Sequence, residues 1–382
     1  MELTNKPNET TFFDSAAVLI EQARRYVGRT ADLTMCVTYF ELGRMIVEEE
    51  QGGSTRAQYG RGLLAELSKF LTKRFGRGFS IATLKNARKF YQTYYPQIQQ
   101  STTVESEIEK GQTLFSLLEN KKLTAKRQTM LAQLYPFTLS WSHYLILMRI
   151  DSPDERRFYE IEAAQQQWTF RQLQRQRGSS LYERLALSRD KNEVMRLAKE
   201  GQVIEKPRDI LKNPLVLEFL GMDEKAAYSE SDLETAIINK LQKFLLELGK
   251  GFLFEARQKR FTFDEDHFIV DLVFYNRLLQ CYVLIDLKTG KLKHQDLGQM
   301  QMYVNYFDRC VKTENENPTV GILLCEEQNN SVVEMTLPKD ANIYSTAYSL
   351  YLPDKSILQQ KLAEWVEEFE EAKELLETTE ET

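Results

Sequence analysis

The chain has 382 residues, of which 42% are hydrophobic, and a formal net charge of −6. This is the composition of a globular protein, and the length exceeds what one compact core needs, so we expect two or three domains. No apolar run approaches the roughly 18 residues of a membrane span, and the N-terminal residues lack a signal-peptide core, so no membrane partner is expected. Widely separated cysteines and histidines disfavour disulfides and a zinc site and favour a cytoplasmic protein.

Charge is unevenly distributed along the chain. Residues 56–95 contain nine Lys or Arg and one acid, whereas residues 363–382 contain nine Glu and one Lys. A basic N-terminal region and an acidic C-terminal segment indicate a nucleic-acid surface at one end only.

The N-terminal part of the chain has helical periodicity and includes a basic helix. A short glycine turn precedes this helix, which Ser80 can cap. Lys85, Arg88 and Lys89 are spaced to share one solvent face, so the helix, turn and basic helix resemble a helix-turn-helix. A solvated helix face explains the same spacing equally well. The helices expected here are 14–28, 30–50, 63–75 and 80–94.

A polar stretch at 96–122 is predicted as a loop or insertion, after which helical spacing resumes. A helix over 169–177 carries further arginines that form a second edge able to contact phosphates. We therefore predict a helical, helix-turn-helix-like nucleic-acid-binding domain over 13–189 and a charged, proline-containing linker region over 190–228. The predicted nucleic-acid-binding residues are Arg77, Lys85, Arg88, Lys89, Arg171 and Arg175.

The C-terminal part changes from helical to strand periodicity. A capping box, with Ser231 as N-cap and Glu234 at the third helical position, opens a helix that ends at Gly249. The apolar period then becomes two, which predicts an antiparallel meander followed by a helix and further strands. Strands enclosed by helices indicate an α/β layered domain over 229–352. The expected strands are 252–263, 267–275, 280–287, 319–325 and a weaker one at 343–347, with the helix at 296–311.

An acidic helix is expected over 353–382. Its apolar residues recur every three or four positions, so this stripe must be covered. It packs either on the preceding domain or on a second protomer, which would form a homodimer.

Two acids and a lysine on neighbouring predicted strands carry the candidate chemistry. Strand alternation places Asp286 and Lys288 on one face, and Asp271 lies on the preceding strand. Two converging carboxylates would repel unless a divalent cation lies between them, and oxygen ligands without His or Cys favour Mg²⁺ or Mn²⁺. Lys288 could orient or activate the attacking water. Ordinary salt bridges between Lys288 and either acid are the alternative.

Three further residues are predicted to belong to this site. A role in helix capping is sufficient to account for Glu234. It also lies at the start of the apolar stripe that must cover the sheet, so it could reach the metal. Gln299 and Tyr303 are one helical turn apart and reach the same side, where they could hold a phosphate or the lysine. Tyr303 could equally be a packing residue.

The order of these residues and several longer stretches resemble a known family. The stretches are ELGKGFLFEARQ, FIVDLVFYNRLLQCYVLIDLKTGKL and GQMQMYVN, with YFELGRMIVEEEQ, YGRGLLAELSKFLTKRFGRGFS, LSWSHYLILMRI and LYERL upstream. Asp271, Asp286 and Lys288 match the acid, acid and lysine of PD-(D/E)xK nucleases. More narrowly, the chain is similar to the YhcG family of bacterial PD-(D/E)xK nucleases, over roughly residues 30–352.

This resemblance implies an all-α, helix-turn-helix-like DNA-binding domain joined to a restriction-endonuclease-like α/β/α nuclease domain. Two positions depart from the family pattern: Val270 stands in place of Pro, and Asp286 stands in place of the more usual Glu. The shorter arm of Asp286 withdraws the carboxyl group by about one methylene, which bears on metal affinity.

The favoured function is a metal-dependent DNA endonuclease in which Asp271 and Asp286 bind Mg²⁺, Glu234 assists and Lys288 acts on the attacking water. A non-catalytic DNA-binding or assembly factor is the alternative, and an accessory protein of a restriction or mobile-element defence system is a third. The sequence does not distinguish DNA from RNA as the substrate.

Overall fold

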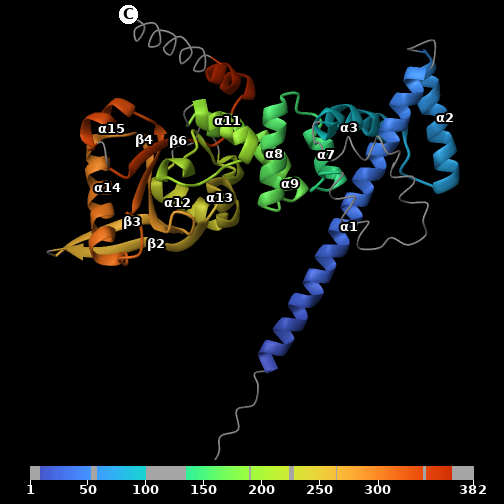
Figure 1. Cartoon of the computed structure of the whole chain (residues 1–382). Coiled ribbons are helices and arrows are strands. Elements are labelled where there is room, and N and C mark those ends of the chain that lie inside the picture. The colour runs from blue at the N-terminus through green and yellow to red at the C-terminus, as the bar shows by residue number, and fades with distance from the viewer. Residues whose placement is uncertain are drawn as a thin grey trace, which may run out of the picture. The chain divides into compact units, whose positions relative to one another are not determined.

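The computed structural model describes residues 9–52, 58–99, 135–188, 191–222, 228–263, 265–338 and 341–363 (Figure 1). The chain forms two compact units, Met1–Arg156 and Arg157–Thr382. In the described ranges, no helix is both long and apolar enough to cross a lipid bilayer.

The N-terminal unit is helical where the structure describes it. The sequence predicted two helices before residue 50, whereas α1 is continuous, because a single glycine (Gly28) costs a helix only about 1 kcal/mol and does not end it. The predicted insertion at 96–122 begins inside the last turn of α3, and its residues from 100 onwards lie outside the described part. The helices are α1 (Glu9–Gly52), α2 (Gln58–Phe75), α3 (Ile81–Gln99) and α7 (Trp141–Leu147).

Aromatic side chains pack α1 against α3 in this unit. The rings of Phe40 and Phe90 meet edge to face with their centroids 5.9 Å apart, and both are buried. Near this contact the backbones approach so closely that a Cβ atom on Gly43 would lie 2.1 Å from the carbonyl oxygen of Ala87. At the start of α3, Ser80 Oγ accepts a hydrogen bond from the Thr83 amide (3.2 Å), as the sequence predicted.

A six-stranded mixed sheet organises the C-terminal unit. Its order is β1-β6-β5-β4-β3-β2, in which β2–β3 and β3–β4 are antiparallel and the pairs from β4 to β1 are parallel. The antiparallel meander that the sequence predicted is therefore present, and the parallel strands follow it. The strands are β1 (Leu215–Val216), β2 (Phe252–Phe263), β3 (Asp266–Asn276), β4 (Cys281–Lys291), β5 (Val320–Glu327) and β6 (Ile343–Ser349).

Helices cover both faces of this sheet, which gives the α/β/α layering that the resemblance implies. On one face Ile285 and Leu287 pack with α12 and α13, and on the other Leu284 packs with α14. In Figure 1 these helices lie on opposite sides of the strands. The helices are α12 (Glu230–Asn239), α13 (Leu241–Leu248), α14 (His294–Tyr306), continued by a π-helical turn (Phe307–Val311), and α15 (Asn330–Thr336).

The capping box of α12 lies two residues before the predicted position. Ser229 is the N-cap, and its hydroxyl accepts from the amide of Asp232, which occupies the third helical position. Both capping boxes fit the sequence pattern, and with the observed one Glu234 is buried, with 2% of its surface exposed. The predicted single helix is also interrupted at Lys240, whose ammonium group donates to the carbonyl oxygens of Phe219 and Leu220 (2.9 and 2.8 Å).

Residues 190–228 differ from the predicted linker. They contain α11 (Lys191–Glu200), two short 3₁₀ turns (Pro207–Ile210 and Glu218–Leu220) and β1, which pairs with β6 through Val216 and Ser349. The charged residues and prolines of this stretch predicted a linker, and β1 is too short, at two residues, to give a strand pattern. The apolar side chains that flank β1 nevertheless pack in the core. The sheet-containing unit also includes α9 (Phe170–Gly178) and α10 (Leu181–Ala186), which the sequence assigned to the N-terminal domain.

A buried ionic cluster joins α9 and α10 to α13. The Arg184 guanidinium group, which is fully buried, lies 2.5 Å from Glu247 Oε1, and Arg175 contacts Glu247 Oε2 at 3.1 Å. Burial disfavours a charged Glu247, but Arg184, Lys212 and Arg175 outweigh it and lower the pKa of Glu247 to about 2. The cluster therefore holds a fully ionised acid inside the unit.

The beginning of the predicted C-terminal helix packs on the same unit. Residues 355–363 are helical, Leu358 is buried, and Lys355 Nζ lies 3.4 Å from Glu183 Oε1 of α10. The rest of the predicted acidic helix, residues 364–382, lies outside the described part.

Candidate active site in the C-terminal unit

Asp271 and Asp286 converge where β3 and β4 separate. The β3–β4 ladder ends at the pair Leu272–Ile285, so the next residues, Asp271 and Asp286, lie opposite each other beyond it. The side chain of Asp271 takes the place of the missing backbone partner, because its Oδ2 accepts a hydrogen bond from the Leu287 amide (2.9 Å). The backbone thus fixes one oxygen of Asp271 beside the second acid.

Burial raises the pKa values of both acids, and the charge of Asp286 raises that of Asp271 further. The pKa of Asp271 is raised to about 7, first by burial and then by the charge of Asp286, against the lowering effect of the Leu287 amide and Lys288. The pKa of Asp286, which is 2% exposed, is also raised, chiefly by burial. Two acids that resist ionisation together are typical of a site that needs a cation or a shared proton.

Lys288 lies on the same face as Asp286, as strand alternation predicted. Its Nζ is 2.8 Å from Asp286 Oδ2 and 3.6 Å from Glu230 Oε2. Burial acts to lower the pKa of Lys288, but the carboxylates of Asp286, Glu230 and Asp271 raise it above its ordinary value. Lys288 is therefore a permanent cation at neutral pH, which suits charge stabilisation rather than proton abstraction.

Two residues of β2 hold Glu234, and one of them also contacts Asp271. Arg257 Nε donates to Glu234 Oε1 (2.6 Å), and Gln258 Nε2 donates to Glu234 Oε2 (2.5 Å). The same Gln258 amide lies 3.3 Å from Asp271 Oδ1. The structure thus brings Glu234 to the predicted site, with its carboxylate held by an arginine and an amide.

Tyr303 supports the strand that carries Asp271. It is 1% exposed, and its hydroxyl donates to the carbonyl oxygen of Ile269 (2.8 Å), two residues before Asp271. Gln299 is exposed and its amide donates to the Tyr303 hydroxyl. Burial raises the pKa of Tyr303, so its hydroxyl stays protonated. Tyr303 is thus a packing residue in the core next to α14, which is the second of the two alternatives, while a contact of Gln299 or Tyr303 with a phosphate or with Lys288 stays a prediction.

The donor set suits a hard divalent cation bound by two carboxylates. Asp286 Oδ2 is buried and, in the described part of the chain, meets Lys288 as an ion pair without a well-directed hydrogen bond. No group of three or more His, Cys, Asp or Glu among the described residues is arranged to hold a metal by itself. Mg²⁺ is commonly held by one or two carboxylates and completes its shell with water and substrate phosphates, so Asp271 and Asp286 fit it.

The predicted nucleic-acid-binding residues divide into three groups. Arg77, Lys85, Lys89 and Arg171 are exposed, as a binding surface requires. Arg88 is half-buried and pairs with Glu50 of α1 (2.7 Å). The prediction for Arg175 is wrong: its side chain is 16% exposed, it pairs with Glu218 and Glu247, and its guanidinium lies over the Phe219 ring.

Sequence comparison covers both units. The profile described as "YhcG PDDEXK nuclease domain" matches residues 208–363, and the one described as "DUF1016 N-terminal domain" matches residues 15–184. The protein named "Putative nuclease YhcG" from Escherichia coli (strain K12) is 37% identical over 353 residues, which cover 91% of this chain and 92% of that protein. The chain belongs to the YhcG family. It therefore carries a nuclease domain of the PD-(D/E)xK type, a class that generally uses divalent metal ions.

Solved structures resemble part of this YhcG-family chain. The crystal structure of a repair endonuclease from Pyrococcus abyssi is 18% identical over 34% of this chain and 50% of that one, with a TM-score of 0.23. The structure of an EndoMS–dsDNA2 complex is 17% identical over 35% of this chain and 50% of that one, with a TM-score of 0.24. The matches span about half of those proteins.

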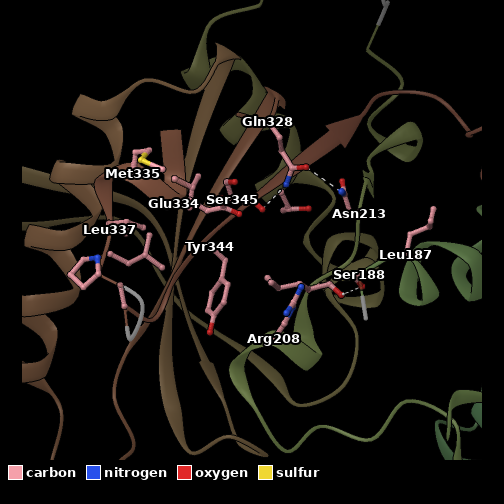
Figure 2. Close-up of a pocket in the computed structure, with 16 residues that line it drawn as sticks. Leu187, Ser188, Arg208, Asn213, Gln328, Glu334, Met335, Leu337, Tyr344 and Ser345 are labelled. Carbon is pink, nitrogen blue, oxygen red and sulfur yellow. Dashed lines mark hydrogen bonds between the residues drawn. The ribbon is translucent and has the colours of Figure 1, made fainter. Parts of the chain in front are cut away.

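A separate cavity of about 830 Å³ lies beside the first half of β6 in the YhcG nuclease unit. Figure 2 shows Tyr344 and Arg208 among its lining residues, and Gln328 hydrogen-bonded to Ser345 (2.6 Å) and to Asn213 (3.1 Å). Most of its other lining residues are aliphatic, and it contains none of the predicted site residues. It offers no acid–acid–lysine arrangement and is distinct from the candidate active site.

Sequence reasoning missed Arg257 and Gln258. Both lie in the quoted stretch ELGKGFLFEARQ, but an Arg-Gln pair in a strand carries no motif. The signal that could have found them is an acidic residue on the helix that covers the sheet together with a basic residue on the edge strand, because the two would form an ion pair across these elements.

The raised pKa of Asp271 predicts how stability depends on pH. Folded protein binds this proton more tightly than unfolded protein does (pKa about 7 against 3.8), so stability falls as pH rises from about 4 to about 7. Asp271→Asn removes this titration. The free energy of unfolding of the variant should therefore exceed that of wild type by about 1–3 kcal/mol between pH 5 and pH 8. Urea unfolding of full-length protein in EDTA measures this, and parallel pH curves for the two proteins would contradict it.

Proposed function

We propose that this YhcG-family nuclease hydrolyses phosphodiester bonds of DNA with Mg²⁺ (or Mn²⁺), with Asp271 and Asp286 as metal ligands and Lys288 assisting the attacking water. The observation that carries the proposal is the convergence of the two acids at the end of the β3–β4 ladder, with Lys288 beside them. A divalent cation bound there would supply positive charge for the phosphate oxygens and help to orient the substrate.

The protein's own residues have separate tasks in this proposal. The Leu287 amide and the Tyr303 hydroxyl fix the position of Asp271 on β3. Lys288 stays protonated, so it orients water through its ammonium group and stabilises charge that develops on the phosphate. Glu234 assists from α12 through its hydrogen bond to Gln258.

The exposed cations of the N-terminal unit are the proposed DNA-contacting surface. The turn between α2 and α3 carries Arg77, and α3 carries Lys85 and Lys89, in the helix, turn and helix order of a helix-turn-helix. Arg171 of α9 is proposed to make a second contact with DNA. Cations on a helix and its preceding turn are suited to phosphate binding, which positions a protein on DNA.

Cleavage of a panel of duplex, branched and single-stranded DNA tests the proposal. Wild-type protein should cleave at least one substrate with Mg²⁺ or Mn²⁺ and none in EDTA. Asp286→Asn removes a ligand charge and should abolish cleavage while DNA binding is retained. Matched RNA substrates in the same panel decide which nucleic acid is cut.

A non-catalytic DNA-binding or assembly factor is the second candidate, and one observation favours it. Every acid of the site already has a cationic or amide partner, as in a structural salt-bridge network. This function predicts salt-dependent DNA binding, no cleavage with either metal, and no effect of Asp286→Asn. Lys85→Gln combined with Lys89→Gln should reduce the salt slope of binding by about 2 under either function, which tests the DNA-contacting surface separately.

A further inference from the structure

Gln258 has an unusual backbone conformation for a residue inside a strand. Its φ is +49°, in the left-handed region that L-residues other than glycine avoid. The other described non-glycine residues with positive φ are Gln167, Ser180, Glu265 and Gln280, and each lies between two elements. In the described chain, Gln258 is thus the one such residue within a β-strand.

This conformation turns the Gln258 side chain toward the acids. Consecutive residues of a regular strand point to opposite faces, yet Arg257 and Gln258 both bind the carboxylate of Glu234. The β2–β3 register explains this, because the pairs Arg257–Leu272 and Lys259–Val270 flank Gln258 and Asp271, which are opposite but unpaired. The irregularity in β2 therefore lies directly across from Asp271.

The Gln258 amide joins the carboxylates of two elements. An amide NH₂ group has two hydrogens, and here it lies within hydrogen-bond distance of Glu234 Oε2 on α12 (2.5 Å) and Asp271 Oδ1 on β3 (3.3 Å). The other oxygen of Asp271 is held by the Leu287 amide. Both oxygens of Asp271 are thereby directed, and its carboxylate cannot rotate without breaking one of these contacts.

We infer that Gln258 is a positioning residue that orients Asp271 and Glu234 for the divalent metal. This inference rests on the proposed function, because it assumes that Asp271 is a metal ligand. Groups that hold metal ligands in place typically change metal affinity by 10–100-fold when they are removed. The left-handed backbone at Gln258 is explained as the conformation that brings its amide to both acids.

The test compares two glutamine-to-glycine variants of the full-length protein. Gln258→Gly keeps the left-handed backbone and removes the amide. Gln280→Gly is the matched control, because Gln280 has φ +51° and is exposed in the turn between β3 and β4. Isothermal titration with MnCl₂, without DNA, measures the dissociation constant, and steady-state cleavage separates kcat from KM.

Gln258→Gly should raise the Mn²⁺ dissociation constant about 10-fold or more. It should also lower kcat while KM for DNA stays within about twofold, because the amide faces the acids. Gln280→Gly should change none of these values. Gln258→Asn, which tolerates the left-handed backbone but has a shorter arm, should lose Mn²⁺ affinity in the same direction.

Two results would overturn the inference and leave the proposed function intact. One is wild-type Mn²⁺ affinity in Gln258→Gly, which would make the amide purely structural. The other is a raised KM with unchanged kcat, which would make Gln258 a DNA contact. Failure of the wild-type protein itself to bind Mn²⁺ would overturn both.

Discussion

Lys288→Ala should lower kcat for DNA cleavage by about 10²–10³-fold, with little change in KM. The physical reason is twofold. The ammonium group is the cation next to Asp286 (2.8 Å), and it stabilises charge that develops on the phosphate during attack. It also lowers the pKa of Asp286 against the effect of burial, so its loss leaves that acid more often protonated and less able to bind a metal.

Two companion variants separate these effects from general loss of charge. Lys288→Arg keeps a permanent cation and should recover Mn²⁺ affinity, while kcat recovers only in part because the planar guanidinium places its donors differently. Lys291→Ala removes an exposed lysine at the end of the same strand and should leave kcat unchanged. Quench-flow measurement of kcat, with calorimetry of Mn²⁺ binding, distinguishes them.

The pH profile gives an independent check on the role of Lys288. A lysine whose pKa is raised above its ordinary value by acidic neighbours cannot be the base that activates water at neutral pH. The acidic limb of the kcat/KM profile should therefore persist in Lys288→Arg. Cleavage by Lys288→Ala at the wild-type rate would remove Lys288 from the mechanism.

The strands and their acids were predictable because strand alternation is a local rule. Successive side chains face opposite ways, so Asp286 and Lys288 could be placed together, with Ile285 and Leu287 on the opposite face, before any fold was known. The same rule broke down at Asp271. Val270 and Val273 both pack in the core next to α14, which strict alternation forbids, because the β2–β3 pairing is interrupted at Gln258 and Asp271.

The remaining errors arise where two readings of the sequence compete. Ser231 with Glu234 and Ser229 with Asp232 both satisfy the capping-box pattern, and only packing of Glu234 against the sheet selects the second. Arg175 lies on an arginine-rich helix whose sequence predicts a solvated face, but its partners Glu218 and Glu247 are 43 and 72 residues away. Long-range ion pairs of this kind leave no periodic signal in a sequence.

Arg184→Met should destabilise the C-terminal unit by about 3–5 kcal/mol, since it leaves Glu247 buried without its principal cation. Arg184 also donates to the carbonyl oxygens of Ser179 (2.7 Å) and Pro214 (2.9 Å), and these acceptors would be left unsatisfied. In a unit of this size the loss corresponds to a fall in Tm on the order of 10 °C. Arg196→Met is the matched control: Arg196 pairs with Glu200 and Glu205 on the surface, and its removal should change Tm little.

The same cluster predicts a pH dependence and a minimal folding unit. Because the pKa of Glu247 is lowered to about 2, its stabilising contribution is complete above about pH 4.5 and is lost as pH falls toward 2, so Arg184→Met and wild type should converge in acid. A fragment that begins at residue 208, where the nuclease-domain match starts, lacks both Arg175 and Arg184. Residues 157–363 should therefore unfold cooperatively by calorimetry, whereas 208–363 should not, and equal stability of the two fragments would show that the cluster is dispensable.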